Sequence, residues 1–163
     1  LQRGLREVMS EQSITELPTY VVELQKRKLL IPSASVAEII PYEILQWIQD
    51  TPDWFLGVLG WRGVQVPVVT LEVLTVAGAT FSLVSVSSAC LVIVRSVTGS
   101  EEVPYFAVVA QTLPRLISLS AEVLCEIQGE PADAELARAR LGKDIVAIPN
   151  IEYIEQAVQS VTG

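Results

Sequence analysis

The chain contains 163 residues, half of them hydrophobic, which is enough to bury a sizeable core in one domain or in two small lobes. Its 19 acidic and 11 basic residues give a net charge of −8, and this balance argues against nucleic-acid binding, which needs a clustered basic surface. Histidine is absent, so the sequence lacks both the commonest general base and the commonest metal ligand.

The N-terminal part of the chain predicts a tail followed by paired strands. Residues 1–18 are polar and mixed, without a secretory signal pattern, and we expect a tail or a short helix there. Apolar residues alternate over 20–24 and return over 29–32 after a charged turn, a pattern typical of a β-hairpin. A third strand is predicted over 36–40, and a loop or short helix rich in bulky side chains follows over 42–49.

The clearest local pattern is a hairpin over residues 55–71. Its first arm is apolar and glycine-spaced, and its second arm alternates in the way that a strand does. The two arms meet at Arg62-Gly63, where the glycine can take the positive φ that a tight reversal needs. Arg62 is therefore expected at the tip of a rigid turn, well placed to meet a carboxylate or backbone carbonyls of a partner.

No charged residue occurs from Val73 to Val94, a length that would suit a membrane helix. We reject that interpretation because the stretch contains six serine and threonine residues and a glycine in its turn-prone middle. The middle is interpreted as a loop that joins two lobes and offers a contact surface. The apolar block at its end, residues 90–94, is predicted to be a buried strand.

A second set of strands and a closing helix are predicted in the rest of the chain. The expected strands cover residues 91–97, 103–110, 115–119 and 144–148. Residues 129–141 are polar, alanine-rich and charged, and we interpret them as an excursion with one short helix. Apolar residues at helical spacing between Ile151 and Val161 predict a terminal helix whose stripe faces the core. Many short strands, few helices and regular turns indicate an all-β barrel or sandwich with a comparable strand set in each half.

The hairpin sequence resembles the signature of CheW-like domains. It reads Gly57-Val58-Leu59-Gly60-Trp61-Arg62-Gly63-Val64-Gln65-Val66-Pro67-Val68-Val69-Thr70-Leu71. The upstream Val36-Ala37-Glu38-Ile39-Ile40 resembles the V-x-E-I segment of that family, at the right spacing. The resemblance covers residues 19–72 and is weaker over 90–156. The chain departs from the family pattern at several positions: Gly60 replaces an Asn, Thr70-Leu71-Glu72 replaces D-L-R, Ala107 stands where a Gly is common, and Gln111 replaces an Asp.

The resemblance implies a fold of two small SH3-like five-stranded barrels packed together, with a C-terminal helix. Residues 1–18 would be a tail and residues 19–163 the CheW-like domain. Its lobes would cover about 34–88 and 89–145, plus the terminal segments.

The resemblance also implies a non-catalytic adaptor, which couples the tip of a chemoreceptor (a methyl-accepting protein) to a CheA-type histidine kinase. Such a protein would be cytoplasmic, recruited to membrane-associated receptor arrays without inserting into the bilayer. A groove between the lobes would accept the receptor tip, and an edge would dock the CheW-like regulatory domain of the kinase. No cofactor, metal or nucleic acid is implied. Divergence from the family pattern favours an accessory member of a pilus-linked system that controls twitching motility over the main flagellar coupler.

Six residues are candidates for partner binding. By motif match, Val36, Glu38 and Arg62 would border the receptor groove. The remaining candidates are Ile40, Trp61 and Gly63. An alternative is that Glu38 and Arg62 pair with each other and hold the hairpin to its neighbouring strand. We expect Trp61 to be half exposed beside Arg62, as an interface anchor or as an isolated surface aromatic.

No constellation in the sequence supports catalysis, since there is no histidine for a triad and no G-x-S-x-G or H-E-x-x-H motif. Cys90 and Cys125 lie far apart without a C-x-x-C motif, so we expect reduced buried thiols rather than a metal site. Two rival interpretations remain. One is a small-molecule-binding β-barrel or an enzyme that uses only carboxylates, and the other is a structural subunit that oligomerises through the uncharged connector.

Overall fold

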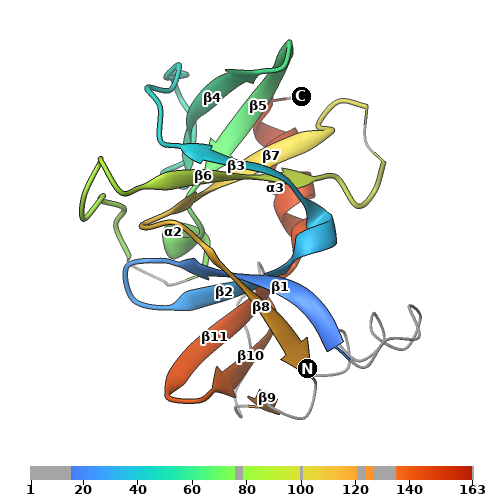
Figure 1. Cartoon of the computed structure of the whole chain (residues 1–163). Helices are drawn as coiled ribbons and strands as arrows, with labels where there is room; N and C mark the ends of the chain where they lie inside the picture. Colours follow the sequence, from blue (N-terminus) through green and yellow to red (C-terminus); the bar gives the residue numbers. More distant parts are fainter. Residues whose placement is uncertain (1–15, 76–78, 100, 121–123, 127–134, 163) are drawn as a thin grey trace.

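A computed structural model describes residues 16–75, 79–99, 101–120, 124–126 and 135–162 (Figure 1). The described chain forms two β-sheets. The five-stranded sheet has the order β3-β6-β7-β5-β4, and the six-stranded sheet has the order β8-β1-β2-β11-β10-β9. The all-β architecture of two lobes with a C-terminal helix is confirmed, with a short sixth strand added to one sheet.

The strands and helices have the following bounds. The five-stranded sheet contains β3 (Val36–Pro41), β4 (Phe55–Trp61), β5 (Val64–Val69), β6 (Cys90–Arg95) and β7 (Tyr105–Ala110). The six-stranded sheet contains β1 (Glu16–Glu23), β2 (Lys28–Pro32), β8 (Arg115–Ser120), β9 (Leu124–Glu126), β10 (Glu135–Leu141) and β11 (Asp144–Pro149). The helices are η1 (Ser33–Ser35), α2 (Leu71–Thr75) and α3 (Ile151–Thr162). β1 thus begins inside the segment 1–18 that was expected to be a tail.

The division of strands between the sheets differs from the expected lobe boundaries of 34–88 and 89–145. β6 and β7 lie in the middle of the sheet that also holds β3, β4 and β5, while β1 and β2 join the later strands. Two parallel pairings, β5 with β7 and β2 with β11, and two antiparallel pairings, β3 with β6 and β1 with β8, create this arrangement. Each sheet is therefore completed by strands from outside its own stretch of sequence, which local patterns do not reveal.

The interpretation of residues 129–141 as an excursion with a short helix is wrong over 135–141, which form β10; residues 129–134 lie outside the described part of the chain. Ala137 and Ala139 are buried, whereas Arg138 and Arg140 point to the more exposed face. The alternation of alanine and arginine was thus a strand signal of period two. It was missed because alanine is a weak strand former when judged by propensity alone.

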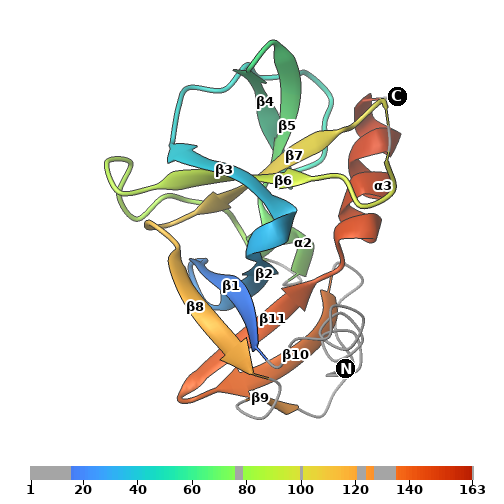
Figure 2. The same ribbon diagram turned by 45° about the vertical axis from the view of Figure 1, so that its right-hand side comes forward.

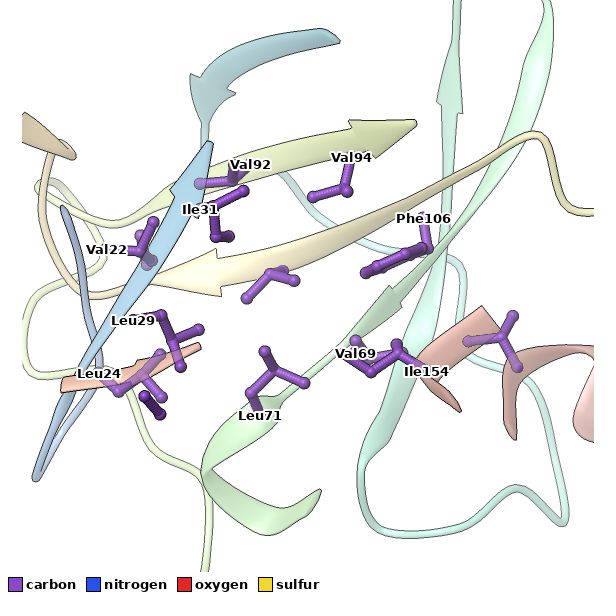
Figure 3. Packing of buried hydrophobic residues seen from close by; sticks show 14 of the residues in the cluster. Val22, Leu24, Leu29, Ile31, Val69, Leu71, Val92, Val94, Phe106 and Ile154 are labelled. Atoms are coloured by element: carbon purple, nitrogen blue, oxygen red, sulfur yellow. The ribbon is translucent and has the colours of Figure 1, made fainter. Parts of the chain in front are cut away.

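Strands β6 and β7 are buried on both faces. Leu91 and Ile93 of β6 pack in the cluster within the five-stranded sheet, while Val92 and Val94 face the other sheet and α3. Figure 3 shows this second cluster, in which side chains from β1, β2, β6, β7 and α3 meet. Burial on both faces explains why residues 90–94 carry no charge, and the predicted buried strand is confirmed. None of the helices in the described chain combines the length and hydrophobicity that crossing a bilayer requires.

The predicted C-terminal helix is confirmed as α3, which lies along the five-stranded sheet (Figure 2). The Asn150 side-chain oxygen accepts a hydrogen bond from the Tyr153 backbone N–H at 3.1 Å, which caps the first turn. Ile154 and Val158 are completely buried against the sheets. The apolar stripe of this helix therefore faces the core, as its spacing indicated.

Candidate functional site

The hairpin between β4 and β5 reverses over the two residues that the sequence indicated. Trp61 pairs with Val64, so Arg62 and Gly63 form the turn. Their φ angles are 48° and 77°, and two positive values in a two-residue loop are typical of a type I′ turn. Glycine adopts this conformation freely, whereas an arginine there costs about 1 kcal/mol. The Arg62 side chain is 68% exposed, which confirms its expected position at the tip.

Glu38 links the two edges of the five-stranded sheet. It lies on β3 at one edge, and Trp61 and Arg62 lie on the β4–β5 hairpin at the opposite edge. Glu38 Oε1 accepts a hydrogen bond from Trp61 Nε1 at 2.8 Å and lies 3.0 Å from Arg62 Nη2. The predicted pairing of Glu38 with Arg62 is thus confirmed. A partly exposed ion pair contributes about 0–1 kcal/mol, whereas a hydrogen bond to a charged acceptor contributes about 1.5–3 kcal/mol. The indole bond is therefore the stronger of the two links.

Trp61 is more buried than expected. Its side chain was predicted to be half exposed, but the residue is only 9% exposed. The indole packs edge-to-face on Tyr105, with ring centroids 5.0 Å apart, and the Arg62 guanidinium lies 4.8 Å from the indole centroid. Because the tryptophan is anchored on one side and stacked on the other, it supports the guanidinium rather than presenting its own surface.

The other candidate residues lie on β3 and at the tip. Ile40 packs on the same interior cluster as Trp61, whereas Val36 packs on the cluster between the two sheets. A register shift between Val36 and Glu38 separates their faces, although they are two positions apart. The structure therefore brings Glu38, Trp61 and Arg62 together next to the exposed Gly63. It does not place Val36 on that same face.

A buried polar network that sequence reasoning missed lies where the two sheets meet. The Glu72 carboxylate is 4% exposed and accepts hydrogen bonds from the Gln25 backbone N–H at 3.1 Å and from Gln111 Nε2 at 3.2 Å. Gln111 also donates to the Ser82 carbonyl at 2.9 Å and accepts from the Val84 backbone N–H at 2.9 Å. Burial raises the pKa of Glu72, and the hydrogen bonds from Gln111 and Gln25 partly oppose that rise.

This network holds the connector between β5 and β6 against both sheets. Val84 and Val86 are 80% and 66% exposed on it, while its role as a contact surface stays a prediction. The signal that could have located the network is the set of departures from the family pattern, because two of them, Glu72 and Gln111, contact each other.

Chemistry at a metal or thiol site finds no support in the described residues. Among them there is no group of three or more His, Cys, Asp or Glu residues that could hold a metal ion. Cys90 is a free thiol, and its burial raises its pKa, which lowers the fraction of reactive thiolate. The side chain of Cys125 lies outside the described part of the structure.

Comparisons with known proteins agree with this architecture. The family model described as the CheW-like domain matches residues 18–159. No curated protein matches the chain. Among solved structures, the chain is similar to the scaffolding protein TtCheW from Thermoanaerobacter tengcongensis, with a TM-score of 0.70 and 13% sequence identity. That likeness covers 85% of this chain and 87% of the other, and at such low identity it shows the fold alone.

Proposed function

Because the chain belongs to the CheW-like domain family, whose members are non-catalytic scaffolds, we propose that it couples a chemoreceptor tip to a CheA-type histidine kinase. It would do so in a cytoplasmic array recruited to membrane-associated receptors. The departures from the family pattern favour an accessory role in a pilus-linked system that controls twitching motility. The protein acts by holding two partners in a fixed relation and carries out no reaction of its own.

The observation that carries this proposal is the presentation of Arg62. A guanidinium has five N–H donors, and the ion pair with Glu38 involves Nη2 alone. The remaining donors are available at a tip that is exposed, strained and braced by a buried indole. Bracing lowers the entropy that the side chain would lose on binding, so a partner carboxylate or carbonyl can be bound with little ordering cost.

The kinase would use a different part of the surface. β8 is an edge strand of the six-stranded sheet, and Leu116 on it is 58% exposed. An edge strand offers unpaired backbone groups, and an adjacent apolar side chain gives such a contact its register. A barrel of similar build, such as a CheW-like regulatory domain, can therefore dock there while the tip of the β4–β5 hairpin remains available to the receptor.

The test compares Arg62→Ala with Lys143→Ala. Lys143 is an exposed cation at the turn between β10 and β11, so the control removes one charge from the other hairpin tip. Calorimetric titration with a cytoplasmic receptor fragment should show about tenfold weaker binding for Arg62→Ala and little change for Lys143→Ala. Thermal unfolding should show that both variants remain folded. Equal affinity of Arg62→Ala and the unchanged protein would refute the role of the tip.

A mass measurement separates the coupler from the structural subunit. Size-exclusion chromatography with light scattering is run on the protein alone, on the kinase regulatory domain alone, and on their mixture. A larger species that forms only in the mixture supports the coupler. Self-association of the protein alone, with no complex in the mixture, supports oligomerisation through the connector and contradicts the proposal.

A further inference from the structure

A groove of about 750 Å³ lies on the β4–β5 hairpin, apart from the Glu38–Arg62 pair. It is bounded by the loop before β4, the hairpin itself, the loop before β7 and the C-terminal end of α3, which lies beside the hairpin in Figure 2. Its lining residues are Gln46, Ile48, Phe55, Val58, Gln65, Pro67, Glu102, Val161 and Thr162. Phe55 and Val58 pack on the face of the sheet opposite to Trp61, so the groove is not part of the site described above.

The groove has a mixed lining of apolar and polar residues, and its rim carries one acidic side chain. Ile48 is 37% exposed beside the partly buried Val58, and Glu102 is the one charged residue among those that line the groove. The last turn of α3 contains no basic residue, so the partial negative charge of its terminal carbonyls is not neutralised from within the helix. Apolar side chains next to Glu102 and to the carbonyl end of α3 fit a ligand that is apolar and cationic together.

The two arginines of this sheet are held elsewhere. Arg62 pairs with Glu38, and Arg95 donates through Nη1 to the carbonyls of Ala34 and Val36 at 3.0 and 2.7 Å. Neither lines the groove. A second copy of this chain would bring its own net charge of −8 to an acidic rim, so charge disfavours self-association there.

We propose that this groove binds a cationic amphipathic segment of a partner protein. Its apolar side chains lie along β4, β5 and the end of α3, and its lysine or arginine side chains face Glu102 and the terminal carbonyls of α3. The mode is that of an amphipathic helix in a groove, with apolar anchors for affinity and complementary charge for selectivity. This contact is independent of the receptor contact at Arg62.

The first experiment uses two synthetic peptides of the same length and leucine spacing, one with lysines and the other with glutamates at the polar positions. Fluorescence anisotropy should show saturable binding of the lysine peptide and none of the glutamate peptide. Amide NMR shifts on titration should concentrate in β4, β5 and the end of α3. Shifts confined to other surfaces, or binding of both peptides, would overturn the proposal.

Variants distinguish the groove from the general acidity of the protein. Glu101 and Glu102 are adjacent and exposed, but only Glu102 lines the groove. Glu102→Lys should weaken binding of the lysine peptide about fivefold, while Glu101→Lys should change it less than about twofold. Gln65→Trp should fill the groove and abolish binding, with the receptor affinity retained. Equal losses in the two glutamate variants, or a self-associated species that Gln65→Trp removes, would contradict the assigned occupant.

Discussion

The molecule contains two hairpins that are each followed by a helix, but the two hairpins differ at the turn. The hairpin β4–β5 leads into α2, and the hairpin β10–β11 leads into α3. In each hairpin the second strand also runs parallel to a strand from elsewhere in the chain, β7 for β5 and β2 for β11. The second hairpin places its positive φ of 62° on Gly142 and keeps Lys143 out of that region, whereas the first hairpin puts Arg62 at 48°.

The two hairpins differ in which residue takes the left-handed conformation. At Gly142 the reversal is made by a residue that adopts the left-handed region without cost. In the first hairpin the left-handed region is occupied by Arg62, a residue type that is strained in that region. Glu38 and Trp61 contact the Arg62 side chain and hold it in place. Strain that the surroundings maintain is a feature of functional positions, and this supports Arg62 as the contact of the coupler.

The helices that follow the hairpins repeat another feature. α2 buries Glu72, whose carboxylate binds Gln25 and Gln111, and α3 buries Glu155, which is 1% exposed. The Glu155 carboxylate accepts hydrogen bonds from the Val97 backbone N–H and from Thr98 Oγ1. In both hairpin–helix segments, a buried carboxylate on the helix helps to hold a loop of the five-stranded sheet. The similarity between the two hairpin–helix segments thus extends from strands to polar contacts.

The largest effect is expected from Gly57→Ala, which breaks the packing of the loop before β4 against the first hairpin. Gly57 has a φ of 148°, and an added Cβ would lie 2.6 Å from the Gln46 backbone oxygen. The bridge between Gln46 and Val58 would have to separate, at a cost of about 3 kcal/mol in the free energy of unfolding. Urea denaturation measures it. Gly60→Ala on the same strand is the control, since its Cβ meets no atom within 4 Å, and a comparable loss there would refute the steric explanation.

Two substitutions of Glu38 distinguish its hydrogen bond with Trp61 from its ion pair with Arg62. Glu38→Ala leaves the buried Trp61 indole without its acceptor and should lower the free energy of unfolding by about 2 kcal/mol. Glu38→Gln keeps an oxygen acceptor and removes only the charge pair with Arg62, so the loss should stay below about 1 kcal/mol. Chemical denaturation of both variants gives the comparison. Similar losses would mean that the indole bond contributes little.

The two turns should differ in their sensitivity to substitution. Gly142→Ala forces a side chain into the left-handed region and should cost about 1 kcal/mol. Arg62→Asn replaces a strained residue with one that tolerates that region, so its stability should stay within about 0.5 kcal/mol of the unchanged protein. Thermal unfolding measures both. A large loss for Arg62→Asn would show that the arginine is retained for stability rather than for binding.

The smallest effect concerns the pH dependence of the free energy of unfolding that arises from Glu72 on α2. Its pKa is raised above 4.5 in the folded state, so the folded protein binds this proton more tightly than the unfolded chain does. The contribution of Glu72 to the free energy of unfolding therefore falls as the pH rises from 4.5 through the folded-state pKa, and is level above it. Glu72→Gln removes that fall, so the variant should gain stability relative to the unchanged protein between pH 4.5 and 7. Parallel stability curves over this range would contradict the assignment.

Two departures from the family pattern lie in one contact. Where the pattern has the arginine of D-L-R and an aspartate, this chain has Glu72 and Gln111, which hydrogen-bond to each other. Gly60, which stands where the pattern has an Asn, is exposed with open space around its Cβ position.

The residue pattern by itself determined most strands, the turn at Arg62-Gly63 and the amphipathic helix α3, because alternation, turn chemistry and helical spacing are properties of neighbouring residues. Only the tertiary structure decided that β6 and β7 join β3, that Trp61 is buried on Tyr105, and that Glu72 meets Gln111. These outcomes depend on pairing between segments far apart in the chain. A residue carries no local mark of which distant partner its strand will take, so burial and buried contacts follow from the assembled sheets.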